Sequence, residues 1–117
     1  MSAPKPGESL CLIWNSADRE VALNMVFMYG GNALPTGWWK RVRLIIWGPA
    51  QKTLVSDEAL QAELYHLADA GVELLACQHC AENYGLVAAL RALGVDVHYT
   101  GAPLTEMLQT GWKVLTF

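Results

Sequence analysis

The chain has 117 residues, of which 53% are hydrophobic and only 16% are charged, and its formal net charge is −3. This length predicts one domain that can fold without a disulfide or a metal. The acidic balance and the lack of a basic run exclude nucleic acid and anionic membranes as expected partners. A small domain with this much apolar material either has a thick core or covers its surface with other subunits, and we favour a homo-oligomer.

Residues 1–9 lack the apolar segment of a signal peptide, and the uncharged stretch 21–39 is interrupted by glycine, proline and asparagine. The three cysteines include one close pair and do not form the even framework of a secreted, disulfide-rich domain. We therefore expect a soluble, cytoplasmic protein without a membrane span. Residues 1–8 are expected to form a disordered N-terminal tail, and residues 9–117 a single domain.

Short apolar runs alternate with helical patterns along the chain. The almost continuously apolar runs 10–14, 42–47 and 72–77 predict strands that are covered on both faces of a parallel sheet. The run 95–99 alternates apolar and polar residues, which places it nearer an edge. Residues 114–117 are predicted to form a fifth strand.

Helices are expected between these strands. Residues 18–29 are apolar nearly all round, so this helix is predicted to pack against the sheet and also against a partner subunit. Residues 57–70 are predicted to form a helix that Ser56 caps. Its apolar stripe consists of Leu60, Leu64 and Leu67. Further helices are expected over 81–93 and 103–109, and Gly85 within the first of them indicates that another element approaches closely there.

This alternation predicts the α/β class, as a three-layer α/β/α sandwich with a five-stranded, mainly parallel sheet. Ligand crevices of such sheets lie beyond the carboxyl ends of the strands. The segments at those ends are 14–16, 47–49, 77–80 and 100–103, the last of which contains Gly101. All four segments are therefore expected along one edge of the sheet.

The pair Cys77 and Cys80 forms a CxxC motif where the third strand gives way to a helix. A thiol there lies beside free backbone N–H groups, which favour the thiolate. We predict that Cys77 is the nucleophile and that Cys80, one turn on, can attack a modified Cys77. His79 can add positive charge nearby, whereas Cys11 lies in an apolar run and is expected to be a buried, small hydrophobic side chain.

Two other interpretations of the motif stay open. The cysteines can be small side chains packed between helix and sheet, or ligands of a metal, although one CxxC supplies only two ligands. A thioredoxin-like oxidoreductase has a different order of elements, because here the motif follows the third strand and no β-hairpin comes after it. We expect no metal and no cofactor.

The aromatic residues suggest a second kind of site. Trp14 and Trp47 each end a strand, so their rings can wall a pocket in which Asn15 or the Gly48 backbone supplies polar contacts. Tyr84, one turn into the helix after the CxxC, is the other candidate pocket residue. Alternatively, a tryptophan at the end of a strand is simply packed in the hydrophobic core or in a subunit interface.

Five segments together resemble one known family: IWNSADREVAL, LIIWGPA, GVELLACQHCAENYG, LGVDVHYTGAPLTEML and GWKVLTF. They are similar to the DsrE/DsrF-like family of small sulfur-relay proteins with the YchN-like fold, and the similarity runs from about Leu10 to Phe117. The stretch around ACxxCAxxYG is the most specific.

The resemblance implies a parallel α/β sandwich that assembles into trimers or hexamers. It also implies that the cysteine at the end of the third strand, here Cys77, carries a persulfide and passes the sulfur to a partner protein. Cys80 departs from the family pattern, because relay members need only one cysteine and a neighbouring thiol can discharge a persulfide.

Two functions therefore remain. The first is a sulfur-handling protein, a persulfide carrier or sulfurtransferase-like relay with a protein donor or acceptor of sulfur. The second is a regulatory module that binds a small ligand or senses oxidation through the CxxC.

Overall fold

The computed structural model describes residues 5–117. Its centre is a five-stranded sheet with the order β4-β3-β2-β1-β5, in which all neighbouring strands are parallel. The strands are β1 (Ser9–Trp14), β2 (Arg41–Ile46), β3 (Glu73–Cys77), β4 (Asp96–His98) and β5 (Lys113–Thr116). The predicted α/β class and parallel sheet are confirmed, and the strand predicted at 95–99 does lie at an edge.

The N-terminal tail that we expected at 1–8 falls partly outside the described residues, because these begin at Lys5. Residues Pro6–Glu8 form a short 3₁₀ turn, η1, directly before β1.

The helices cover the two faces of the sheet unequally. After β1 come α1 (Arg19–Val21), η2 (Ala22–Phe27) and α2 (Met28–Ala33); after β2 come α3 (Ala50–Val55) and α4 (Glu58–Asp69); after β3 come α5 (Gln78–Tyr84) and α6 (Val87–Ala92). Each of these connections moves one strand along the sheet, so right-handed crossovers place all of them on one face.

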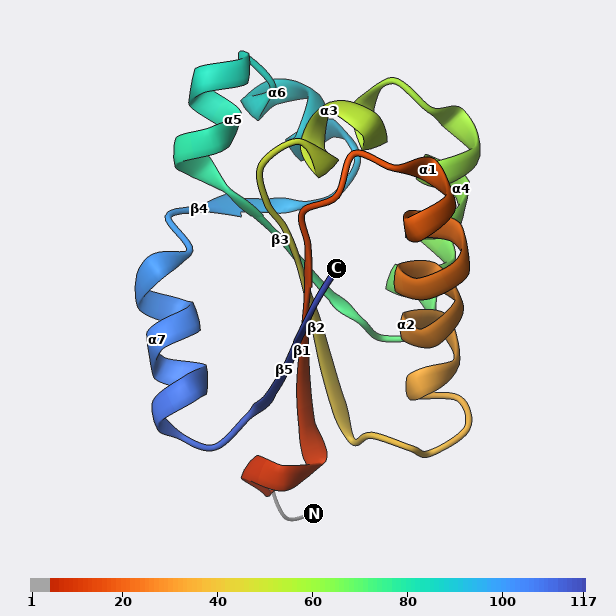
Figure 1. Cartoon of the computed structure of the whole chain (residues 1–117), viewed down its shortest axis with the longest axis vertical. Helices are drawn as coiled ribbons and strands as arrows, with labels where there is room; N and C mark the ends of the chain where they lie inside the picture. Colours follow the sequence, from red (N-terminus) through yellow and green to blue (C-terminus); the bar gives the residue numbers. More distant parts are fainter. Residues whose placement is uncertain (1–4) are drawn as a thin grey trace.

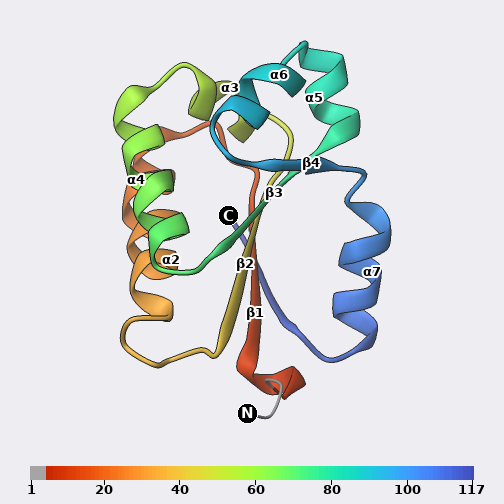
Figure 2. The same ribbon diagram turned by 180° about the vertical axis from the view of Figure 1, so that it is seen from behind.

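The last connection runs in the opposite direction, from β4 at one edge to β5 at the other. Its helix, α7 (Gly101–Gln109), therefore lies on the second face, apart from the other helices (Figures 1 and 2). The molecule is thus the predicted three-layer sandwich, with one helix as its third layer in the part of the chain that the structure describes.

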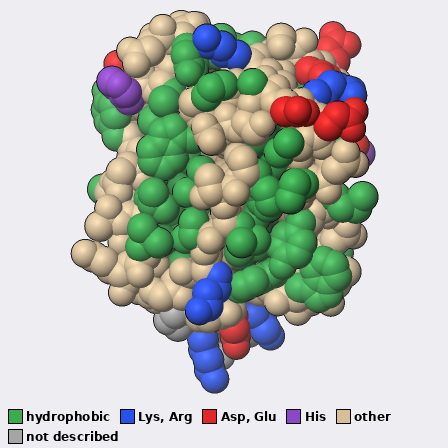
Figure 3. Space-filling view, viewed as in Figure 1, with side chains coloured by type: hydrophobic (Ala, Val, Ile, Leu, Met, Phe, Trp, Pro, Cys, Tyr) green, Lys and Arg blue, Asp and Glu red, His purple; other side chains and the backbone are tan. Residues whose placement is uncertain are grey.

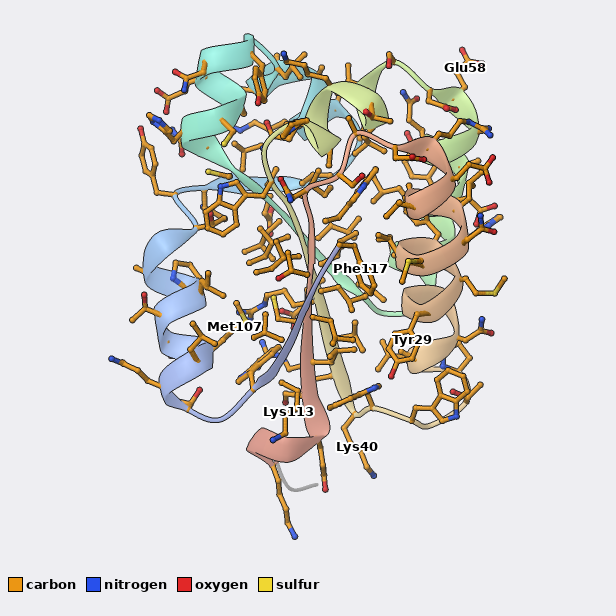
Figure 4. The ribbon with its side chains drawn as sticks, in the orientation of Figure 1. Tyr29, Lys40, Glu58, Met107, Lys113 and Phe117 are labelled. Carbon is orange, nitrogen blue, oxygen red and sulfur yellow. The ribbon has the colours of Figure 1, made fainter. Side chains whose placement is uncertain are left out.

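Two hydrophobic cores result from this arrangement. The larger one, between the sheet and α1 to α6, contains Trp14, Ala76 and most of the fully buried leucines. The smaller one, between the sheet and α7, is built on Cys11, Ile45 and Met107. Met107 lies between α7 and the sheet (Figure 4). The thinner second face is the one on which the thiols are found.

The start of α4 differs from the prediction. Asp57, not Ser56, is its N-cap, and the Asp57 carboxylate accepts hydrogen bonds from the amides of Ala59 and Leu60 at 3.0 and 3.2 Å. Ser56 ends α3 instead, where its hydroxyl donates to the Lys52 carbonyl at 2.9 Å. The predicted stripe is confirmed, since all three of its leucines are buried.

The helical region predicted over 18–29 begins at Arg19, with Asp18 as its N-cap, and continues to Ala33. Its middle part, Ala22–Phe27, is π-helical. This region packs on the sheet side as predicted. Met25 and Met28 are left exposed on its outer side.

The prediction of a single helix over 81–93 is wrong in one respect. It is two helices, because Gly85 adopts φ 68°, a left-handed conformation that ends α5. An added Cβ at Gly85 would meet no atom within 4 Å. The glycine is therefore there for its backbone conformation and not for the close approach that we expected. No helix within residues 5–117 is long and apolar enough to cross a membrane.

Candidate functional site

The carboxyl ends of the parallel strands meet along one edge, as predicted. At this edge the Trp47 amide donates to the Trp14 carbonyl at 2.8 Å, which joins the ends of β1 and β2. The side-chain amide of Gln51 donates to the carbonyls of Ile46 and Cys77, both at 3.0 Å. Gln51 is fully buried and thus ties the end of β2 to the end of β3, where Cys77 lies.

Cys77 is the last residue of β3 and the N-cap of α5, with φ −66° and ψ 116°. Successive side chains of a strand point to opposite faces, and the preceding Ala76 belongs to the larger core. The Cys77 side chain therefore lies on the face that α7 covers. It is only 5% exposed.

The surroundings of Cys77 favour its thiolate. Burial acts to raise the pKa of Cys77, but hydrogen bonds from the Cys80 amide, the Thr100 hydroxyl, the Cys80 thiol and the His79 amide outweigh it. The pKa of Cys77 consequently lies below its ordinary value. Hydrogen-bond donors stabilise the charged form of a thiol, and a thiolate is the nucleophilic form of cysteine.

Thr100 contributes the least expected of these donors. It is the N-cap of α7, is only 2% exposed, and its Oγ1 has no conventional hydrogen-bond partner among the described residues. A buried hydroxyl without a partner costs free energy, and the position of this one near Cys77 acts to lower the pKa of that thiol. Residues 100–103 were predicted to lie at this edge, but no pattern in the sequence singled out Thr100.

Cys80 lies in the first turn of α5 and is more accessible than Cys77. Burial raises the pKa of Cys80, as does contact with Cys77, whereas the Gly48 amide and the Trp47 indole N–H act in the opposite direction. The net pKa is above the ordinary value. All three cysteines are free thiols. The two pKa values are thus displaced in opposite directions, which agrees with the prediction that Cys77 has the lower pKa of the pair.

We call Cys77, Cys80, Trp47, Gly48 and Thr100 the thiol site. They come from three strand ends: the turn after β2, the junction of β3 with α5, and the start of α7. The site is thus assembled by the parallel sheet and not by one local motif.

The two tryptophans predicted to wall one pocket lie on opposite faces of the sheet. Trp14 is fully buried in the larger core, where its ring meets Phe27 edge to face with 5.3 Å between centroids. Trp47 packs against the smaller core. The structure therefore brings Trp47, but not Trp14, to the thiols.

Asn15 and His79 are exposed near the thiol site. Asn15 Oδ1 would be 3.5 Å from a Cβ built on Gly48, so it borders the turn after β2. The His79 ring lies 3.4 Å from the Asn83 amide, along the outer side of α5. His79 thus contributes its backbone N–H to Cys77, and its ring lies with Asn83.

Tyr84 and Gly101 lie further from the sulfur atoms. The Tyr84 ring is covered by the Lys52 ammonium group, 4.3 Å from the ring centroid, between α5 and α3. Gly101 is the exposed first residue of α7, and its carbonyl accepts a hydrogen bond from Thr105. Their predicted binding roles stay predictions.

Cys11 takes no part in the site. It is fully buried in the smaller core, as predicted, and burial raises its pKa to about 11, against a small opposing effect of Arg43. Within residues 5–117, no three His, Cys, Asp or Glu side chains converge on a point where a metal ion could bind.

The fold and the site define a small, all-parallel α/β protein with two neighbouring free cysteines at the carboxyl edge of its sheet. Residues 9–117 match the DsrE/DsrF-like family, and the chain belongs to that family.

Solved structures agree with this assignment. A conserved protein of unknown function from Bacteroides thetaiotaomicron is 35% identical, with a TM-score of 0.90 over 94% of this chain and 95% of that one. The YchN protein of E. coli is 18% identical, with a TM-score of 0.73 over 94% and 99% of the two chains. A protein of unknown function from Methanobacterium thermoautotrophicum is also 18% identical, with a TM-score of 0.74 over 95% and 99%. The last two show the shared fold alone. A comparison with curated proteins found no match.

Proposed function

We propose that this protein is a sulfur carrier in which Cys77 accepts sulfane sulfur as a persulfide and passes it to an acceptor thiol. The main support is the state of Cys77, an almost buried thiol whose neighbours lower its pKa although burial alone would raise it. Membership of the DsrE/DsrF-like family suggests a sulfur-relay role at the level of the family.

The proposed transfer has two steps. The Cys77 thiolate attacks the sulfane sulfur of a donor persulfide, an S–S bond forms, and the donor leaves as a thiolate. An acceptor thiolate then attacks the outer sulfur of the Cys77 persulfide, and Cys77 leaves as a thiolate. The sulfur moves without a net change in oxidation state, so neither step needs an oxidant or a reductant.

The same hydrogen bonds serve both steps. Donors from Thr100 and from the amides of His79 and Cys80 stabilise the thiolate, which is the nucleophile in the first step and the leaving group in the second. This double use explains why a carrier benefits from a lowered pKa at the cysteine that it loads.

Substitution of each thiol tests the proposal. Cys77→Ser should abolish loading from a persulfide donor, whereas Cys80→Ser should preserve loading or make the loaded form longer-lived. The second expectation follows because Cys80 can attack the inner sulfur of the Cys77 persulfide, which forms a disulfide and releases hydrosulfide.

Time-resolved mass spectrometry of both variants provides the measurement, and Cys11→Ala is the control for the loss of a thiol outside the site. Loading that survives Cys77→Ser, or that disappears in Cys80→Ser, would contradict these roles.

The second candidate function is a thiol redox sensor. It is favoured by the position of the two free thiols, Cys77 and Cys80, one turn apart at the start of α5, where a disulfide would join neighbouring residues of the helix. The ligand-binding form of this alternative is weaker, because Trp14 lies on the other face from Trp47.

We also propose that the chain forms a homo-oligomer. Between α2, η2 and β5 lies an apolar surface, which we define as Met25, Met28, Tyr29, Trp38, Leu115 and Phe117, around a cavity of about 360 Å³. Hydrophobic side chains gather on this face in Figure 3, and Tyr29 and Phe117 border it in Figure 4. Met28 is 58% and Leu115 43% exposed, and β5 is an edge strand. A second copy would cover these groups, and the family resemblance favours trimers or hexamers.

A further inference from the structure

Cys77 has a histidine as its neighbour in the sheet. β4 lies beside the end of β3 and leads into α7 (Figure 1), and the two strands pair in parallel with Cys77 opposite His98. Neighbouring strands of a sheet are about 4.8 Å apart. The register therefore places His98 directly beside Cys77, although the two residues are far apart in the sequence.

The residues just before these two show that both side chains point to the same face. Ala76 in β3 and Val97 in β4 belong to the larger core. Successive side chains of a strand alternate between the faces of the sheet, so Cys77 and His98 both point to the face of α7. Their exposure differs, since Cys77 is only 5% exposed whereas His98 is exposed. His98 is thus the accessible neighbour of a nearly buried thiol.

A cavity of about 430 Å³ extends along β3 and β4 to this pair of residues. Its lining includes Leu75 and Asp96, which are paired with each other two residues before Cys77 and His98. His98 itself lines the cavity as well. A small molecule in the cavity would therefore lie beside His98, at the strand position next to Cys77.

The charged groups around the cavity differ in what they can do. The Glu73 carboxylate accepts hydrogen bonds from the guanidinium groups of Arg41 and Arg43, both at 2.8 Å. Asp96 is exposed and lies on the same face as His98, two residues earlier. The contribution of α7 to the lining is a proline, which carries no charge. Among these types of side chain, histidine is the one that commonly takes up and releases protons near neutral pH.

We propose that His98 is the proton-transfer group of the sulfur relay, and that the cavity beside it admits the thiol that accepts sulfur from Cys77. The inference rests on the proposed function, because it needs a Cys77 persulfide as its substrate. His98 then acts as a general base toward the acceptor and as a general acid toward the donor.

The two steps balance without a further reactant. In the transfer, His98 takes the proton of the acceptor thiol, and the acceptor sulfur attacks the outer sulfur of the Cys77 persulfide. A new S–S bond forms at the acceptor, the S–S bond at Cys77 breaks, and Cys77 leaves as a thiolate with the electron pair of that bond. In the next loading, the Cys77 thiolate attacks the outer sulfur of a donor persulfide, and the departing donor thiolate takes the proton from His98. Both side chains are then ready for another transfer, and no oxidant or reductant is consumed.

The burial of Cys77 and the state of common thiols explain why a base is needed here. Few water molecules can reach a sulfur that is only 5% exposed, so they cannot readily take up a proton released beside it. The ordinary pKa of a cysteine thiol is about 8.5, so an aliphatic acceptor is mostly protonated at neutral pH and is a weak nucleophile in that form. His98 should therefore matter for such acceptors and not for thiols that are already ionised.

The choice of acceptor tests the inference. The protein is loaded with a small-molecule polysulfide, separated from the excess, and mixed at about pH 7.5 with 2-mercaptoethanol, which is protonated, or with thiophenol, which is largely ionised. Mass spectrometry follows the loss of the added sulfur relative to a sample without acceptor. In His98→Gln, transfer to 2-mercaptoethanol should slow about 100-fold, the lower end of what a positioned proton-transfer group contributes. Transfer to thiophenol should keep its rate, because this acceptor brings no proton.

His66→Gln is the matched control, because His66 is an exposed histidine on α4, away from the cavity, and both rates should stay unchanged. An equal slowing with both acceptors in His98→Gln would indicate a structural role and overturn the inference. An unchanged rate with 2-mercaptoethanol would also overturn it, and in both cases the carrier function would stand. A protein that takes up no sulfur at Cys77 would contradict the carrier function itself.

Discussion

At the scale of single residues, the thiol site depends on small polar contacts and not on charged side chains close to the sulfur. Thr100 is the clearest case. Its buried hydroxyl lacks a conventional partner, and it lowers the pKa of Cys77 from a different strand end. A buried hydroxyl without a partner is uncommon in native structures, so its position beside Cys77 calls for a direct test.

Thr100→Val should make Cys77 less acidic. The substitution keeps the shape of the side chain but removes a donor that stabilises the thiolate, so the pKa of Cys77 should rise. The measurement is the rate of alkylation by iodoacetamide as a function of pH. In the unchanged protein Cys77 should be labelled before Cys80, and in Thr100→Val its pH profile should move to higher pH.

Thr105→Val is the control for that experiment, since Thr105 donates to the Gly101 carbonyl on the exposed side of the same helix. Its profile should match that of the unchanged protein. Faster labelling of Cys80 than of Cys77, or an unmoved profile in Thr100→Val, would refute the role assigned to the hydroxyl.

The sequence predicted the position of Cys77 well, because an apolar run followed directly by a helical pattern is a local signal. It could not predict Thr100, Gln51 or the indole of Trp47 as neighbours of the thiols. These neighbours are distant in sequence, since Gln51 and Cys77 are 26 positions apart, and their approach depends on the register of the strands. The prediction that Trp14 and Trp47 wall one pocket was wrong for the same reason. Trp14 pairs with Ile46 in the sheet, so the next residue, Trp47, lies on the other face.

At the scale of secondary structure, the element most visible in sequence was the strand. The five strands were predicted within about two residues of their observed ends, a usual boundary error. Helices were less certain because their ends depend on individual capping groups. Asp57 and Ser56 are both good caps by composition, and only the hydrogen bonds show which helix each one serves.

One substitution made at two glycines should have opposite effects on stability. Gly85→Ala forces an L side chain into a left-handed conformation and should destabilise the fold by about 1 to 2 kcal/mol. Gly31→Ala lies inside α2, where the new Cβ meets only Leu67 at 3.5 Å, and should stabilise by up to about 1 kcal/mol. Urea unfolding of both variants measures the difference, and a stabilising Gly85→Ala would contradict the assigned turn.

At the scale of the whole molecule, the unequal layers leave an apolar surface that the chain does not cover by itself. The composition indicated such a surplus, and the structure locates it beside the edge strand β5. The thiol site lies at the carboxyl edge of the sheet, on the strands β2 and β3 and at the start of α7. None of the residues of the apolar surface belongs to the thiol site, so the two can be tested separately.

Light scattering at micromolar concentration should show a trimer or a hexamer. The double variant Met28→Asp and Leu115→Asp should shift the protein toward monomer, because it places two charges where a partner copy would bury apolar groups. Leu108→Asp on α7, at a side chain that is 56% exposed, is the control and should not change the mass. A monomer in the unchanged protein would contradict the proposed assembly.

The most direct test of the sulfur-carrier account is the intact mass of the unchanged protein after incubation with a persulfide donor, measured before and after treatment with a reductant. The account predicts a gain of about 32 Da, one sulfur atom, that the reductant removes. A loss of about 2 Da without any gain would indicate a Cys77–Cys80 disulfide and favour the redox sensor. An unchanged mass under these conditions would contradict sulfur loading at Cys77.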